Sequence, residues 1–361
     1  MEQIQSKLLG GIPKIRKVAN VAKIVFILWK YMIHIKTILH ELPHPPQGKT
    51  GWPWDCEVNP NHNHDFRNEV CIPISIVTPN FNGAEHLEEA IRSVILQNYP
   101  RLEYYVIDGG SADNSVDIIR RYSPWLSGWL SETDEGQSDA INKGYSRVSG
   151  EVFNWLCSDD LLSKGALWQI SRFLLRNPQV DVLAGRCLLR YESNKLMKSV
   201  ARTAVEDISS YSYLASVWQP SCYFRKKCVL RSELVNNKLH YCMDRELWSY
   251  LNSVRARWEE IPVVLSTYRF TGKNKSVTGG SEIIRELVDI SGIYHRNPPG
   301  LASLLKVFWI PIVVRINHCM GNRQKMTLRF ISKVLTIILL IIYPKTHVKM
   351  LQKQFYSYSR W

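Results

Sequence analysis

Short apolar runs alternate with segments of helical apolar spacing along the middle of the chain, beginning at residue 72. Four runs have the length and composition of buried strands: IPISIVTP, LEYYVIDGG, SGWLSE and EVFNWLCSDD. A helical segment follows each of them, and VDVLAGRCLLRY and RWEEIPVVLSTYRF predict further strands before a closing helix, SEIIRELVDISGIY. Such alternation predicts an α/β fold with a doubly wound, mostly parallel sheet, whose ligand site lies at the carboxyl ends of the strands.

The net charge of +14 is carried by the two ends of the chain. Residues 1–50 contain eight Lys or Arg and two acids, and eleven Lys or Arg but no acid follow Asp289, so the middle of the chain is mildly acidic. Proteins that bind nucleic acid more often carry their basic patch on the folded core. Basic ends that are also apolar favour an anionic membrane surface as the partner and argue against nucleic acid.

Four segments follow from these patterns. Residues 1–45 include the apolar stretch 18–39, which three lysines interrupt. Because a membrane span needs about 20 apolar residues, this stretch predicts a membrane-associating amphipathic helix, with a helix packed on the domain as the alternative. A Pro-, Gly- and His-rich linker is predicted over residues 46–70, and the folded domain over residues 71–290. The basic, apolar tail 291–361 predicts interfacial helices, or else a re-entrant hairpin.

The eight cysteines are scattered along the chain without a C-x-x-C pair. This spacing argues against a zinc site and against a disulfide framework, and it fits a reducing compartment.

Four acidic residues combine positions and chemistry that point to one site. Asp108, Asp159 and Asp160 follow predicted strands, and Asp244 lies near a predicted helix start. Each alone is more simply a turn residue or a helix cap, but strand-end acids converge on one edge of a parallel sheet. A carboxylate there can hold Mg²⁺ or Mn²⁺ against a diphosphate, and a second one can deprotonate an attacking hydroxyl.

Two ordered stretches carry a resemblance to a known family. PISIVTPNFNGAEHLEEAIRSVILQNYPRLEYYVIDGGSADNSVDIIRRY is followed by SETDEGQSDAINKGYSRVSGEVFNWLCSDDLL, and together they resemble the family 2 glycosyltransferases. The resemblance covers roughly residues 70–270 and implies the GT-A fold of nucleotide-diphospho-sugar transferases. It also implies transfer of a hexosyl-type sugar by a single displacement with inversion, and a UDP-sugar is the first expectation for the donor.

The resemblance assigns roles to individual residues. It implies that Pro79 and Phe81 lie against the nucleotide base, that Asp108 contacts the base, and that Gln137 and Asn142 lie beside the donor. For the remaining residues it implies a ribose contact at Asp159, a Mn²⁺ or Mg²⁺ ligand at Asp160, a general base at Asp244, and an acceptor-side motif at Gln219 and Pro220, with Glu246 near it.

The sequence departs from the family pattern at two positions. Ser158 stands where the metal motif often has an acid, which leaves the ion more dependent on phosphate oxygens. Thr271 stands where a late loop often has a histidine. Arg269 or Lys275 could neutralise the diphosphate instead, although a solvated basic loop is an equal alternative.

The basic ends and the resemblance together predict a lipid-linked or polysaccharide acceptor and a place at the cytoplasmic face of a bacterial inner membrane, peripheral or monotopic. Two other readings remain. The two departures leave room for an inactive nucleotide- or glycan-binding scaffold of the same fold. Gly109-Gly110 after a strand would fit a dinucleotide-dependent oxidoreductase, but the G-x-G-x-x-G spacing is missing.

Overall fold

The computed structural model describes residues 38–59, 70–191, 198–201 and 217–294. Within them, nine strands form one sheet in the order β3-β2-β1-β4-β8-β6-β9-β5, with β7 beside β6. The strands are β1 (Ile74–Asn80), β2 (Leu102–Asp108), β3 (Gly128–Ser131), β4 (Val152–Trp155), β5 (Leu161–Leu162), β6 (Val182–Tyr191), β7 (Lys198–Ala201), β8 (Cys222–Arg225) and β9 (Trp258–Phe270).

One half of the sheet is parallel. β1 pairs with β2 and β4, and β2 pairs with β3. In this register Asn80 lies beside Asp108, and Asp108 beside Ser131, so the carboxyl ends of three strands meet at one edge. The other half is mixed: β8 runs antiparallel to β4 and β6, while β6 and β9 are parallel.

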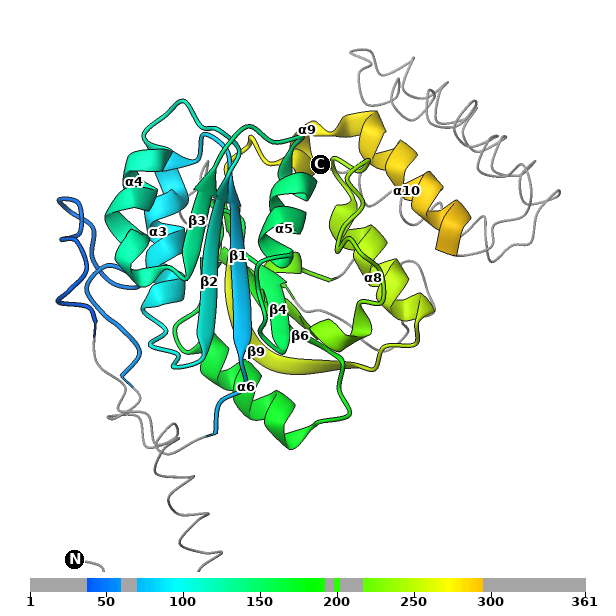
Figure 1. Cartoon of the computed structure of the whole chain (residues 1–361), viewed down its shortest axis with the longest axis horizontal. Helices are drawn as coiled ribbons and strands as arrows, with labels where there is room; N and C mark the ends of the chain where they lie inside the picture. The colour runs from blue at the N-terminus through cyan, green and yellow to red at the C-terminus, as the bar shows by residue number, and fades with distance from the viewer. Residues whose placement is uncertain (1–37, 60–69, 192–197, 202–216, 295–361) are drawn as a thin grey trace, which may run out of the picture.

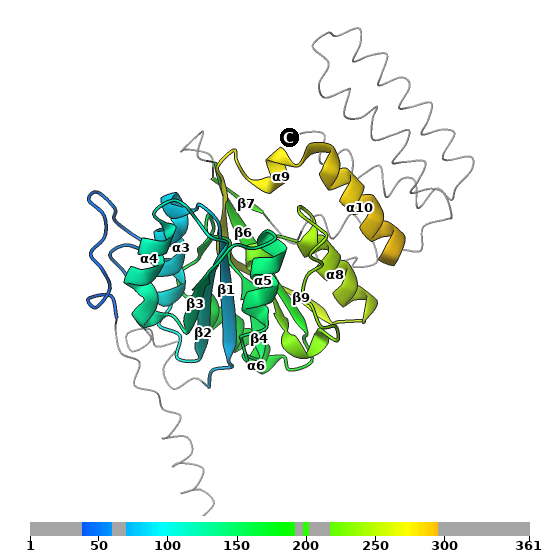
Figure 2. The same cartoon turned by 45° about the horizontal axis from the view of Figure 1, so that its top comes forward.

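Helices cover both faces of the sheet (Figures 1 and 2). Side chains of α3 (Ala84–Ile95), α4 (Ser115–Tyr122) and α6 (Ala166–Arg176) join one core cluster, which includes Ile76 and Val106 of the sheet. The cluster on the opposite face is formed with α5 (Gln137–Tyr145), α8 (Met243–Ser253) and α10 (Gly280–Tyr294). The shorter elements are η1 (Ser123–Trp125), η2 (Gln219–Ser221), η3 (Lys226–Cys228) and α9 (Lys275–Thr278).

The predicted α/β class and the alternation of strands and helices are confirmed. One strand is shorter than its apolar run: β4 ends at Trp155, because the chain then turns and Asp160 N donates to Cys157 O at 3.0 Å. The acids at the end of this run therefore lie on a turn, which frees their side chains for other contacts.

Residues 38–59, which include part of the predicted linker, pack against the folded domain. Leu42 and Val58 are buried in the core cluster of the α3 face, and Trp54 is buried as well. The guanidinium of Arg92 in α3 donates to the carbonyl oxygens of Pro43, Pro53 and Trp54. This segment is therefore an integral part of the domain.

The membrane-associating segments predicted from the sequence lie almost entirely outside the described residues, since residues 1–37 and 295–361 are not among them. Among the residues that are described, none of the helices combines the length and apolar character of a membrane span.

Candidate active site

Asp108 ends strand β2 and ties three strand ends together. Its Oδ1 accepts hydrogen bonds from Asn80 Nδ2 at 2.7 Å and Ser111 Oγ at 2.5 Å. Its Oδ2 accepts from Ser111 N at 3.0 Å and Ser131 Oγ at 2.7 Å. Burial alone would raise the pKa of Asp108, but the hydrogen bonds from these three residues outweigh it and lower the pKa. Asp108, predicted to contact the base, thus holds the carboxyl ends of β1, β2 and β3 together.

Asp108→Asn is expected to lower the free energy of unfolding by about 2–3 kcal/mol at pH 7, because an amide must turn a donor toward N–H or hydroxyl groups. The folded-state pKa of Asp108 is lowered, so its stabilisation is present above the unfolded pKa and is lost as the pH falls through the folded value. Urea unfolding should show the gap between variant and wild type shrinking below about pH 4. Asp117→Asn is the matched control, since Asp117 forms an exposed pair with Arg120. Equal stability of Asp108→Asn and wild type at pH 7 would contradict this role.

The loop after β1 lies against the turn after β4. Pro79 is buried in β1, whereas Phe81, just beyond the strand, is 66% exposed and available to stack on a planar base. Gly83 permits the approach, since a Cβ at this residue would lie 2.7 Å from Ser158 Oγ. The segment predicted to hold the base and the turn predicted to hold the metal are therefore in contact.

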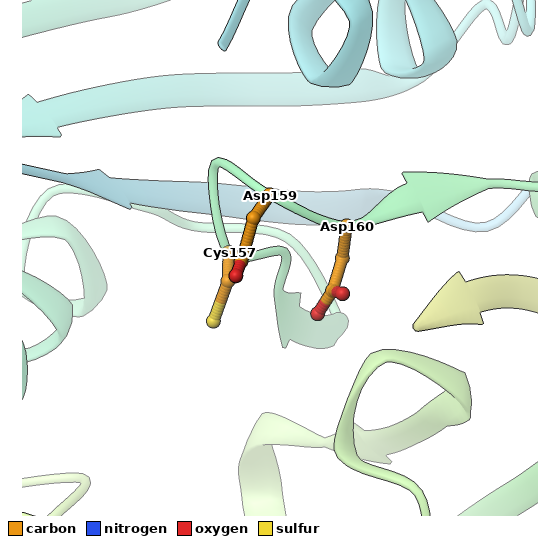
Figure 3. Close-up of side chains that lie close together, drawn as sticks. All are labelled: Cys157, Asp159 and Asp160. Carbon is orange, nitrogen blue, oxygen red and sulfur yellow. The ribbon is translucent and has the colours of Figure 1, made fainter. Parts of the chain in front are cut away.

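Cys157, Asp159 and Asp160 gather on the turn that follows β4, with their side chains on the same side of the loop (Figure 3). One ligand atom from each lies within 4.8 Å of the others. Asp160 is 1% exposed, and burial first, then the charge of Asp159, raises its pKa well above the usual value. A bound cation would offset the repulsion between two adjacent carboxylates that are shielded from water, and carboxylate oxygens are ligands that Mn²⁺ and Mg²⁺ prefer. The residues at this turn therefore fit the expected metal.

Arg269 supports the turn from strand β9. Its backbone N donates to Asp160 Oδ1 at 3.1 Å, and its Nε donates to Asp159 O at 2.9 Å. Its guanidinium is buried and pairs with Glu89 of α3 at 3.1 Å. Arg269, a predicted candidate for neutralising the diphosphate, thus has a positioning role in the structure.

The loop after β9 completes the surroundings of the turn. Asn274 Nδ2 donates to Asp159 Oδ2 at 3.0 Å, and Asn274 Oδ1 accepts from Thr271 N at 2.7 Å. Lys275 is exposed, and its Nζ donates to His240 O at 3.1 Å. Of the two cations predicted for the diphosphate, Lys275 is the one with an exposed side chain, although partial burial of its ammonium group lowers its pKa.

Asp244 lies in the first turn of helix α8, and its charge acts on the same turn. The pKa of the Cys157 thiol is raised by burial and by the charges of Asp160, Asp159 and Asp244, and Lys275 opposes the rise. All four charges are thus within electrostatic range of one sulfur atom. Asp244 is half-buried, and desolvation raises its own pKa despite the neighbouring Arg245. A carboxylate with a raised pKa is a better proton acceptor, as a general base requires.

Glu286 of α10 fixes the start of the helix that carries Asp244. Its carboxylate accepts from the backbone N of His240 at 2.8 Å, Tyr241 at 3.0 Å and Cys242 at 2.7 Å. These bonds hold the segment that leads into α8, and the bond from Cys242, the N-cap, satisfies an N–H group that has no partner in the helix. Glu286 therefore determines where Asp244 stands.

Glu286→Gln is expected to lower kcat about tenfold or more while the donor KM changes little, because a small displacement of a catalytic group is costly. Glu282→Gln on the same helix is the control, since Glu282 forms an exposed pair with Arg285. Release of nucleoside diphosphate by both variants measures the effect, with circular dichroism to confirm folding. A wild-type kcat in Glu286→Gln would show that α8 is held without this carboxylate.

Three other predicted residues adjoin the turn. Gln137, the first residue of α5, donates from Nε2 to Cys157 Sγ at 3.1 Å. Gln219 Nε2 donates to Asn154 Oδ1 at 2.8 Å and to Trp155 O at 2.7 Å. Pro220 is buried beside it in η2. This motif therefore packs on β4 directly before the turn.

Two further predicted residues are engaged in packing within the protein. The amide of Asn142 donates from Nδ2 to Val235 O at 2.8 Å and accepts at Oδ1 from Leu234 N at 3.0 Å. Glu246 is 3% exposed, pairs with Arg231 at 2.6 Å and accepts from the hydroxyl of Tyr294. In this structure both side chains hold elements of the α5 and α8 face together.

Four residues of the site escaped the sequence analysis: Cys157, Asn274, Glu286 and Asp134. Asp134 could have been identified from the sequence, because it stands in TDEGQSD directly after the third predicted strand. The structure places its carboxylate against Gly109, where a Cβ would lie 2.6 Å from Asp134 Oδ2. The charge of Asp134 also acts to raise the pKa of Lys275, against the lowering caused by burial. Asn274 and Glu286 act across more than 40 residues of sequence, as the bond that His240 N donates to Glu286 illustrates.

Comparisons with known proteins agree with this geometry. Residues 75–237 match the family model of glycosyl transferase family 2. An uncharacterized glycosyltransferase of Rickettsia typhi is 32% identical over 187 residues, which cover 48% of this chain and 57% of that protein. One of Rickettsia prowazekii is 30% identical over 187 residues with the same coverage. The match thus extends over little more than half the length of these relatives.

Two solved structures share the fold. TarS of S. aureus, residues 1–349, gives a TM-score of 0.51 at 16% identity and covers 80% of this chain and 89% of its own. A mannosyltransferase of Pyrobaculum calidifontis, solved with GDP-Man and Mn²⁺, gives a TM-score of 0.52 at 15% identity and covers 95% of both chains. At such identities the likeness shows the fold alone. Residues 75–237 are therefore similar to glycosyl transferase family 2, and the described part of the chain has the GT-A fold.

Proposed function

We propose that this chain transfers a sugar from a nucleoside-diphosphate sugar to an acceptor hydroxyl, with inversion at the anomeric carbon. The observation that carries the proposal is the cluster of Cys157, Asp159 and Asp160 on the turn after β4, with the charges of Asp244 and Lys275 in electrostatic range of the same thiol. TarS has been solved with UDP and with UDP-GlcNAc, and the mannosyltransferase with GDP-Man. A UDP-sugar is the first candidate donor for this chain, and a GDP-sugar is the second.

In the proposed reaction Asp244 takes the proton of the acceptor hydroxyl. The hydroxyl oxygen forms the new bond to the anomeric carbon while the bond from that carbon to the phosphate oxygen breaks, and the nucleoside diphosphate leaves from the opposite face. Lys275 offers an ammonium group to the departing diphosphate. Asp160, with Asp159 beside it, would hold Mn²⁺ or Mg²⁺, which supplies positive charge for the leaving group when bound.

A thermal-shift screen tests the donor side. UDP- and GDP-sugars are each added with and without Mn²⁺, and a cognate donor should raise the melting temperature because it binds the native state. The cognate donor should then release nucleoside diphosphate on incubation with the protein. The proposal fails if no nucleotide sugar raises the melting temperature and none is turned over.

We further propose that the chain acts on a lipid-linked or polysaccharide acceptor at the cytoplasmic face of a bacterial membrane. The support is the basic excess in residues 1–50 and after Asp289. Flotation with vesicles of phosphatidylglycerol should carry the full-length chain upward, and added salt should weaken the binding. Equal flotation with neutral phosphatidylcholine vesicles would remove the electrostatic part of this proposal.

A further inference from the structure

Four aromatic residues form a strip where β6 and β9 end. The rings of Tyr191 and Phe270 are stacked, with centroids 4.4 Å apart and planes 3° apart. Tyr268 lies 4.9 Å from Phe270, and Trp218 lies 5.6 Å from Tyr268. The pairing of Tyr191 with Phe270 in the parallel register of β6 and β9 brings these two rings together. We call these four residues the aromatic strip.

The aromatic strip is separate from the packed interior. Within the described part of the chain, none of its four residues belongs to either hydrophobic core cluster. Each of the four is half-buried and keeps part of its surface in solvent. A cluster of partly exposed aromatic rings outside the core is typical of a binding surface.

The aromatic strip is connected directly to the active site. Tyr268 and Phe270 flank Arg269, whose backbone N donates to Asp160. Trp218 precedes Gln219, which donates a hydrogen bond to Trp155 O at the end of β4, directly before the turn that carries Asp159 and Asp160. A hydrogen bond of 2.5 Å between Ser221 Oγ and Ser266 Oγ holds η2 against β9. The strip therefore stands at a fixed position relative to the carboxylates.

Strand alternation decides which face of the sheet the strip occupies. Leu265 belongs to the core cluster of the α3 face, and Arg269 reaches Glu89 of α3 on that same face. Tyr268 and Phe270 alternate with Arg269, so they lie on the opposite face, which carries α8 and Asp244. The strip thus shares its face of the sheet with the group proposed to deprotonate the acceptor.

We propose that the aromatic strip is the acceptor subsite and that it binds a pyranose ring of the acceptor. The proposal rests on the transferase function proposed above and names the class of its second substrate. Aromatic rings have negative faces and positive edges, so they attract both the C–H groups and the hydroxyl oxygens of a sugar. The phenol groups of Tyr191 and Tyr268 add hydrogen-bonding capacity that a lipid chain would not use.

The test uses acceptor-stimulated release of nucleoside diphosphate from the cognate donor. Methyl glycosides of glucose, galactose, mannose, N-acetylglucosamine and rhamnose serve as acceptor probes. Tyr268→Leu and Phe270→Leu should each raise the KM of a stimulating glycoside about three- to tenfold, the worth of one aromatic contact. The donor KM should stay within about twofold, because ground-state donor binding does not involve the strip. Tyr268→Phe should retain most of the acceptor binding.

Phe173→Leu is the matched control, since Phe173 is a half-buried phenylalanine on α6 at the opposite face. Melting temperatures of all variants separate lost packing from lost binding. An unchanged acceptor KM in both strip variants, or an equal rise in donor and acceptor KM, would overturn the proposal. The proposal would also be overturned if the donor binds and is hydrolysed but none of the glycosides stimulates release of nucleoside diphosphate. A protein that binds no nucleotide sugar would instead refute the transferase function itself.

Discussion

Asp244→Asn is expected to lower kcat for sugar transfer about 10²–10⁴-fold, the usual contribution of a general base. Asparagine keeps the size of the side chain but cannot accept the proton of the attacking hydroxyl. The donor should bind as before, because Asp244 acts on the acceptor side of the reaction. Release of nucleoside diphosphate gives kcat, and the donor-induced thermal shift gives binding.

The pH profile separates this role from a structural one. Desolvation raises the pKa of Asp244, and only the ionised carboxylate can accept a proton. Activity should therefore fall on the acid side at a pH above the usual aspartate value of about 4, and this limb should be absent from the residual activity of Asp244→Asn. Asp289→Asn, an exposed acid on α10, is the control. A near wild-type kcat in Asp244→Asn would exclude Asp244 as the base.

Asp160→Asn is expected to lower metal-stimulated activity about 10²–10³-fold, because a bound cation contributes several kcal/mol to stabilising the departing charge. Without metal the variant should melt at the same temperature as wild type or higher, since it removes one of two like charges at a desolvated turn. With donor and Mn²⁺ present, wild type should gain stability and the variant should gain much less.

Asp159→Asn serves as the comparison for Asp160→Asn. Asp159 Oδ2 already accepts a hydrogen bond from Asn274, so its loss should disturb the turn and weaken donor binding with a smaller effect on the metal response. If Asp160→Asn responds to Mn²⁺ as strongly as wild type does, the assignment of the metal ligand is wrong.

The parallel half of the fold could be predicted from sequence because its signals are local. β1, β2 and β4 are apolar runs bounded by turn residues, and α4 lies where a helical segment was predicted after the second run. Strand partners are not a local property. The antiparallel placement of β8 between β4 and β6 joins segments far apart in sequence, and no periodicity within four residues specifies it.

The same distinction applies to the site. The order of Asp108, Asp159 and Asp160 along predicted strand ends allowed their convergence to be predicted. What each carboxylate binds could not be read from the sequence. Two of the four hydrogen bonds of Asp108 depend on the register that sets Asn80 and Ser131 beside it. The buried pairing of Arg269 with Glu89 likewise depends on how α3 lies relative to β9. The sequence therefore could not show that the Arg269 guanidinium, expected at the diphosphate, pairs with a protein carboxylate.

The central claim is that a donor diphosphate and a cation bind at the turn formed by Cys157, Asp159 and Asp160, with Asp244 facing them. A crystal structure of the chain with the cognate nucleoside diphosphate and Mn²⁺ tests it most directly, since anomalous scattering locates the ion. The account predicts an ion bound to an Asp160 oxygen at about 2.1 Å, with the diphosphate between this turn and Lys275. An ion and nucleotide bound elsewhere, with the carboxylate of Asp160 still enclosed by protein, would contradict it.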